Sequence, residues 1–177
     1  MSKSEPKTGL VPPHPKEWEG RAGLISLVRD AVQAVDWPHK ESHFKLDEVQ
    51  CFPSTLLMTL LTYCYAKGIY GSEQVEETAK LDPTLRVLFQ KVRPEAGTIR
   101  KFRRRHHEDI KHCLMWVLEL AFPMRFGESG KNETPIDHCV ARALDRWFEP
   151  ICGPRPEEEA AERLDRAGFW DGMSQVD

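Results

Sequence analysis

The sequence has no long apolar run and none of the short motifs that hold phosphate or position a hydrolytic nucleophile. No stretch approaches the roughly 20 apolar residues that a helix needs to cross a bilayer, and the first residues do not resemble a signal peptide. Glycine-rich phosphate loops, the G-x-S-x-G elbow and the H-E-x-x-H zinc motif are absent as well. We therefore expect a cytoplasmic protein without a membrane partner, and no motif indicates an enzyme.

Cysteine is sparse and dispersed: the five cysteines stand at positions 51, 64, 113, 139 and 152, with no Cys-x-x-Cys pair. An odd number at wide spacing argues against a disulfide framework, and the missing pairs argue against a zinc ribbon. The neighbouring His106 and His107 point about 100° apart on a helix, so they do not share one ion easily. We predict free thiols, no metal site and no cofactor.

Patterns typical of β-strands, such as alternating Val, Ile and Thr, are also missing. Apolar residues instead recur at helical spacing, which predicts seven or eight helices and an all-α, compact multi-helix domain. The expected helices cover residues 21–35, a strongly apolar stretch around 56–64 that stops at Gly68, a short stretch from Ser72, residues 83–90, a stretch from Thr98 to about Ala121, residues 135–148 and residues 156–167.

Helix start and stop signals support several of these boundaries. Asp82-Pro83 combines an N-cap acid with proline at the first helical position. Gly168 is expected to end the last helix. The stretch from Thr98 could form one long helix or two helices in series. Residues 1–20 are rich in proline and polar residues, and we expect a mobile arm there.

The most informative segment is residues 98–107, which concentrates positive charge in a chain whose net charge is -3. Its apolar side chains fall within roughly 80° of one another on a helical projection; they are Ile99, Phe102, His106, Ile110, Cys113 and Val117. Arg100, Lys101, Arg104 and Arg105 fall on the opposite face, and Arg103 lies at the apolar edge. Such a helix can bury one face and present guanidinium groups to a polyanion.

A run of charge on a helix is also the ordinary form of a solvated surface. Two details favour nucleic acid here. Four of the five cations are arginine, whose planar guanidinium suits phosphates and guanine edges. The nearest acids, Glu108 and Asp109, follow the run and cannot pair with all of it.

Residues 52–121 carry a series of short motifs in a characteristic order. They are Phe52-Pro53, Leu56-Leu57, Leu60-Leu61, Tyr65-Ala66-Lys67-Gly68-Ile69-Tyr70, Ser72-Glu73-Gln74-Val75, Leu85-Arg86-Val87-Leu88, Pro94, Thr98-Ile99 and Phe102-Arg103-Arg104. In this order and spacing the segment resembles the N-terminal domain of bacterial insertion-sequence transposases of the InsH type.

The resemblance implies a helical module that binds the terminal DNA of a transposable element in DNA transposition and recombination. In that family a separate RNase H-like domain carries an Asp-Asp-Glu triad that binds metal ions. The segment that the resemblance does not cover, residues 123–177, has the sequence pattern of loops and helices. We expect no catalytic domain, and therefore no enzyme. The expected organisation is a mobile arm at 1–20, a DNA-binding domain at 21–122 and a short helical C-terminal extension at 123–177.

Two hypotheses follow. In the first, the protein binds double-stranded DNA through a helix-turn-helix-like element formed by residues 83–90, the turn at 91–97 and the helix from Thr98. The candidate DNA-binding residues are Lys91, Arg93, Thr98, Arg100, Lys101, Arg103, Arg104 and Arg105. In the second, it is an interaction module without DNA contact, in which residues 123–177 bind a second copy or a full-length transposase, or cover the basic face.

Overall fold

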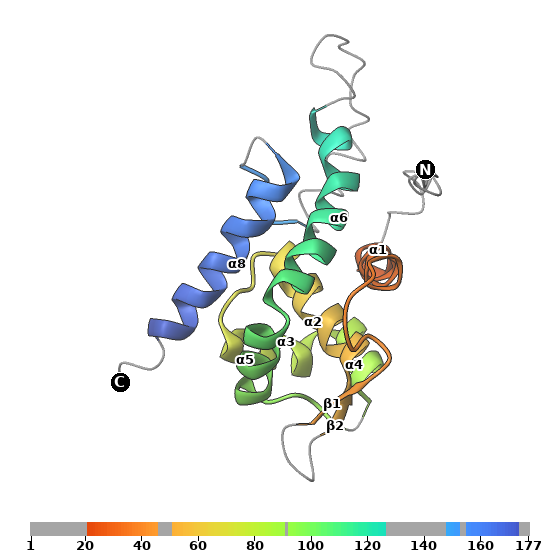
Figure 1. The fold of residues 1–177 in the computed structure, drawn as a ribbon, viewed down its shortest axis with the longest axis vertical. Coiled ribbons are helices and arrows are strands. Elements are labelled where there is room, and N and C mark those ends of the chain that lie inside the picture. Colours follow the sequence, from red (N-terminus) through yellow and green to blue (C-terminus); the bar gives the residue numbers. More distant parts are fainter. Residues whose placement is uncertain (1–20, 46–50, 91, 127–147, 153–154, 174–177) are drawn as a thin grey trace, which may run out of the picture.

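The computed structural model describes residues 21–45, 51–90, 92–126, 148–152 and 155–173. Over these residues the chain is mostly helical, and the all-α prediction is confirmed. The expected arm at 1–20 and most of the expected helix at 135–148 lie outside the described residues. The helices surround α2 (Ser54–Ala66), which lies in the middle of the fold (Figure 1).

Helix α2 is central because it is apolar on every side. Eleven of its residues are buried, among them Leu57, Leu60 and Leu61. Helices α1 (Arg21–Ala34) and α6 (His107–Phe126) pack against it, as do α3 (Ser72–Leu81) and α5 (Ala96–Arg105). The strongly apolar sequence around 56–64 thus becomes the core of the described structure.

A small antiparallel sheet was not expected from the sequence. Strands β1 (His43–Lys45) and β2 (Cys51–Pro53) pair with Phe44 opposite Phe52. Each strand has only three residues, too few for an alternating pattern to stand out. The central phenylalanine of each strand is buried. The ring of Phe44 meets that of Phe102 in α5 edge to face, at 5.2 Å between centroids. The sheet therefore supports α5 from one side.

Helix α4 (Pro83–Phe89) begins as its sequence signal predicts. The Asp82 side chain accepts a hydrogen bond of 2.8 Å from Thr84 N, and Pro83 takes the first helical position. The same carboxylate accepts a hydrogen bond of 3.1 Å from the Tyr63 hydroxyl. Asp82 thus caps α4 and, through its hydrogen bond with Tyr63, links this helix to α2.

The stretch from Thr98 to Ala121 forms two helices in series, α5 and α6, which meet at His106. Residue His106 is buried, its backbone leaves the helical region, and its Nδ1 lies 3.0 Å from the Asp109 carboxylate. Its ring packs on Phe102 and Trp37, with centroids 4.5 Å and 5.6 Å apart. The bend at His106 lets α5 lie against α3 while α6 runs along α2.

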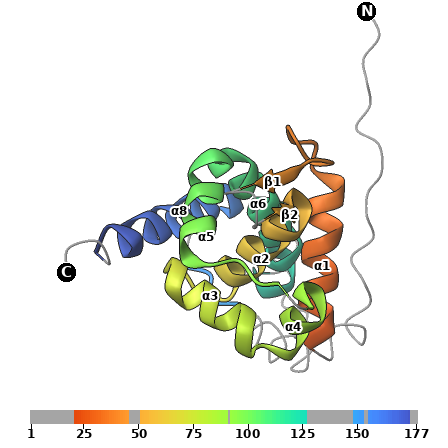
Figure 2. The same ribbon diagram turned by 90° about the horizontal axis from the view of Figure 1, so that it is seen from below.

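Helix α8 (Pro156–Met173) continues past Gly168, so the expected end at that glycine is wrong. It lies against α6, and in the view of Figure 2 its last turns extend beyond the other helices (Figures 1 and 2). Ala160, Leu164 and Ala167 on its inner face join the common core. Helix α8 packs on the same hydrophobic cluster as the helices of residues 21–122.

One buried arginine joins α8 to the C-terminal end of α2. Arg163 donates hydrogen bonds to the carbonyl oxygens of Tyr65 (3.1 Å) and Ala66 (2.8 Å) and to that of Glu149 (3.0 Å). Its Nε pairs with the Glu159 carboxylate at 2.7 Å, and both side chains are fully buried. The arginine satisfies helix-end carbonyls that would otherwise lack partners. This contact fixes where α8 lies.

Candidate nucleic-acid interface

Helix α5 carries the basic segment, and its apolar face is buried as predicted. Ile99 and Phe102 are at most 1% exposed. The start of the helix is held by α3, because Ala96 N donates a hydrogen bond of 2.8 Å to the Glu76 carboxylate. Hydrogen bonds from Lys80 and from this backbone amide lower the pKa of Glu76. Helix α5 is therefore anchored at its first turn and along its inner face.

Three of the predicted DNA contacts face solvent. Lys101, Arg104 and Arg105 are exposed. Their spacing of three and four residues places them on one side of α5, opposite Ile99 and Phe102. These three side chains form what we call the basic strip. An exposed cationic surface is thus present on a helix whose other face is fixed in the core.

The structure corrects the outward placement of Arg100. Its side chain is 22% exposed and pairs with the Glu73 carboxylate of α3, and its Nε lies 3.7 Å from Asp171 Oδ2 of α8. The sequence suggested a free guanidinium because no acid lies within four residues of Arg100, the reach of a pair along one helix. Its partners come from helices that packing brings to α5.

Arg103 and Thr98 are buried, with exposed fractions of 5% and 0%. Arg103 pairs with the Asp171 carboxylate, and its Nη1 lies 3.5 Å from the Tyr65 hydroxyl. Burial alone would lower the pKa of Arg103, but Tyr65 and Asp171 outweigh it and the pKa is raised, so the guanidinium stays charged. In this arrangement neither Arg103 nor Thr98 is open to DNA.

The two remaining candidates lie before α5. Arg93 is half-buried, and its Nε has no hydrogen-bond partner among the residues that the structure describes. Lys91 lies outside the described residues. Helices α4 and α5 both pack against α3. The helix-turn-helix-like element remains a prediction.

Asp171 is the residue that sequence reasoning missed. Its carboxylate is 3% exposed and accepts hydrogen bonds from Ser72 N (2.9 Å) and Ser72 Oγ (2.7 Å) at the start of α3, besides pairing with Arg103. One signal could have revealed it. Positions 160, 164, 167 and 171 form one helical stripe, and an acid on an otherwise apolar stripe needs a buried partner.

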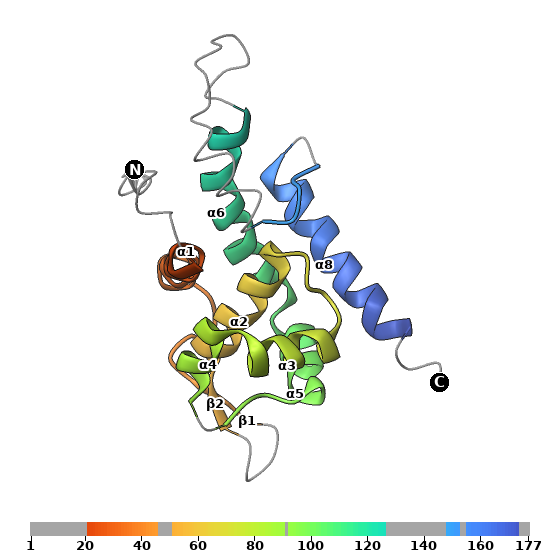
Figure 3. The ribbon, with the colours of Figure 1, turned by 180° about the vertical axis from the view of Figure 1, so that it is seen from behind.

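A groove of about 280 Å³ lies between the basic strip and α8. Arg103, Arg104 and His107 line one side of it, and Asp165, Gly168 and Asp171 line the other. The groove is partly enclosed and polar, and it connects the exposed Arg104 with the buried pair of Arg103 and Asp171. Figure 3 shows the C-terminal part of α8 beside α5.

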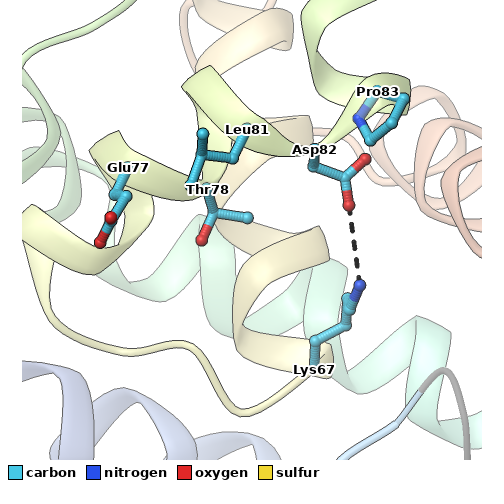
Figure 4. A pocket seen from close by; sticks show the side chains of 6 residues that line it. All are labelled: Lys67, Glu77, Thr78, Leu81, Asp82 and Pro83. Atoms are coloured by element: carbon cyan, nitrogen blue, oxygen red, sulfur yellow. Dashed lines mark ion pairs between the residues drawn. The ribbon is translucent and has the colours of Figure 1, made fainter.

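A second, shallower cavity of about 360 Å³ lies where α2 ends and α4 begins (Figure 4). Its charged groups include Lys67 and Asp82, which form an ion pair at 3.8 Å. Lys67 Nζ also lies 3.3 Å from the Tyr63 hydroxyl. These charges neutralise one another, and their contacts stabilise the junction between the two helices.

His106 and His107, at the end of the basic segment, each contact one carboxylate. His106 contacts Asp109, and His107 Nδ1 lies 3.1 Å from the Glu108 carboxylate. Among the described residues, no three His, Cys, Asp or Glu side chains come together as a metal site would require. The described cysteines are free thiols, and burial raises the pKa of Cys113 to about 12.

Within the part of the chain that the structure describes, no helix combines the length and the hydropathy needed to span a bilayer. Comparison of the chain with protein-family models, with curated proteins and with solved structures gave no match.

Proposed function

We propose that this protein is a module that binds double-stranded DNA, with the basic strip on the DNA backbone. The resemblance to the N-terminal domain of InsH-type transposases suggests DNA at the end of a transposable element as the target. The observation that carries the proposal is the exposure of Lys101, Arg104 and Arg105 on a helix whose opposite face is buried.

The geometry suits phosphate contact for three reasons. The strip lies on a regular helix, so its three cations keep a fixed spacing. Two of them are arginines, which can donate two parallel hydrogen bonds to a phosphate. The anchoring of α5 to α3 and to the small sheet keeps the strip in place before DNA arrives. Such preorganisation lowers the entropic cost of binding.

The test is fluorescence anisotropy with a labelled duplex at low salt. The variant R104Q/R105Q removes two cations of the strip, and we expect its affinity to fall roughly tenfold or more because two phosphate contacts are lost. The matched control is R29Q/K45Q, which removes the same charge from exposed positions in α1 and β1. Equal loss in both variants would show that only net charge matters, and the strip would not be the binding surface.

A second function is favoured by the outer surface of α8. Phe169, Trp170 and Met173 are 65%, 46% and 55% exposed near the end of this helix. Large exposed apolar side chains that lie together are typical of protein interfaces. In this alternative the chain binds a second copy of itself or a full-length transposase and inhibits it without contacting DNA. Binding of this kind would not weaken with salt.

The proposal assigns no catalytic step to the chain. In the resembling family, strand cleavage requires a separate domain with three carboxylates that hold metal ions. A plasmid-nicking assay with magnesium tests this part of the proposal. Nicking by the purified chain, lost on mutation of one of its carboxylates, would contradict it.

A further inference from the structure

We propose that Ser72, Arg100 and Arg103 form a binding site for a backbone phosphate of DNA, and that Asp171 of α8 occupies this site as an internal substitute. We call these three residues the anion site. Helix α8 would then limit DNA binding by holding the site closed. This inference rests on the proposed function, because it adds a second contact and its regulation to the same DNA surface.

The donors of the anion site are those that bind phosphate in proteins. The site combines a backbone N–H at the start of α3, the Ser72 hydroxyl, and the guanidinium groups of Arg100 and Arg103. The positive end of a helix and arginine side chains both favour an anion. Four different groups therefore converge on one carboxylate.

Asp171 does not use every donor of the site. Its Oδ1 accepts from Ser72 N, and its Oδ2 accepts from Ser72 Oγ and from Arg103. The buried Nε of Arg100 lies 3.7 Å from Oδ2 and has no hydrogen-bond partner among the described residues. A phosphate is larger than a carboxylate and has more acceptor oxygens. It could therefore engage the donor that Asp171 leaves unused.

The position of the site connects it with the basic strip. Arg100 and Arg103 belong to the same helix as Lys101 and Arg104, and the groove of about 280 Å³ runs from Arg104 to Asp171. Displacement of the last turn of α8 would remove one wall of this groove. A DNA backbone that contacts the basic strip could then reach the anion site.

Helix α8 is weak where it closes the site. Gly168 and Gly172 flank Asp171, and glycine destabilises a helix relative to alanine because its backbone loses more conformational freedom on folding. Neither glycine is required by packing, because a Cβ at either position would meet no atom within 4 Å. The end of α8 also carries the exposed Phe169 and Met173, which add little burial. Apart from the contacts of Asp171, which a phosphate would replace, these features lower the cost of detaching the last turn.

The test compares three variants by fluorescence anisotropy with a labelled duplex. Asp171→Asn removes the competing charge, and we expect affinity to rise roughly fivefold or more and the salt slope to steepen by about one. G168A/G172A strengthens the end of α8, and we expect affinity to fall. Glu119→Gln is the control, because it makes the same charge change at an exposed position of α6.

A second measurement uses inorganic phosphate in place of DNA. Phosphate should raise the unfolding temperature of Asp171→Asn above that in chloride of equal ionic strength. It should raise neither that of the native chain nor that of R103Q/D171N. If D171N binds DNA no more tightly than E119Q and phosphate does not stabilise it, the inference is overturned. If D171N does not fold, unchanged DNA affinity of G168A/G172A overturns it instead.

The two proposals fail in different ways. If phosphate stabilises D171N but neither D171N nor the native chain binds DNA, the proposed DNA-binding function is wrong and the chain has an anion site. If the native chain binds DNA through the basic strip but D171N behaves like E119Q in both measurements, only the role of Asp171 is refuted.

Discussion

At the scale of single residues, burial decides what each arginine can do. Arg104 and Arg105 are exposed, Arg100 is mostly covered, and Arg103 and Arg163 are buried with carboxylate partners. A buried guanidinium needs its partners because an unpaired charge in the interior is very costly. The same side chain therefore serves as a surface contact in one place and as an internal tie in another.

Arg163 gives the clearest stability prediction at this scale. Its replacement by methionine removes the buried ion pair with Glu159 and three hydrogen bonds to carbonyl oxygens. We expect R163M to lower the free energy of unfolding by about 3–5 kcal/mol. Urea unfolding followed by circular dichroism measures this change.

The matched control is R166M on the same helix. Arg166 is 33% exposed and pairs with Glu149 and Glu162 at the surface, so we expect a loss of about 1 kcal/mol or less. Similar losses in the two variants would show that the carbonyl contacts of Arg163 contribute little to stability.

At the scale of elements, helix starts were predictable and some helix ends were not. Asp82-Pro83 predicted the start of α4, because capping depends on residues that are neighbours in sequence. Gly168 did not end α8; the helix continues and brings Asp171 to Ser72 and Arg103, partners that the sequence around Gly168 does not show. The strands were missed because their pairing depends on residues outside each strand.

The capping role of Asp82 can be measured directly. Asp82→Ala removes the acceptor for Thr84 N and for the Tyr63 hydroxyl, and we expect a loss of about 1–2 kcal/mol in the free energy of unfolding. Asp82→Asn keeps an oxygen acceptor and should lose much less. An equal loss in both variants would assign the effect to the ion pair with Lys67 instead of the cap.

At the scale of the whole molecule, positive charge is concentrated in residues 98–107 of a chain that is negative overall. The chain carries a net charge of -3, so any attraction to DNA must come from a small surface and not from the average field. With Arg100 and Arg103 held by internal carboxylates, the basic strip offers three cations. The number of phosphates neutralised should therefore be lower than the number of arginines and lysines in the segment suggests.

The salt dependence of DNA affinity tests this count. If about three phosphates are neutralised, log K should fall against log salt concentration with a slope near -3, measured between about 50 and 200 mM salt. A slope near -4 would mean that Arg100 and Arg103 also neutralise a phosphate. No dependence on salt, with retained association, would favour the apolar surface of α8 and the alternative function.

The sequence by itself determined where most of the described helices lie, where α4 begins, and which face of α5 is buried. These properties depend on neighbours within one or two turns, and the sequence displays those neighbours directly. Only the tertiary structure decided which cations of α5 remain exposed. Arg103 meets Tyr65 and Asp171, which lie 38 and 68 positions away in the chain. A helical projection gives the angle between side chains on one helix, but it does not show which other helix will cover them.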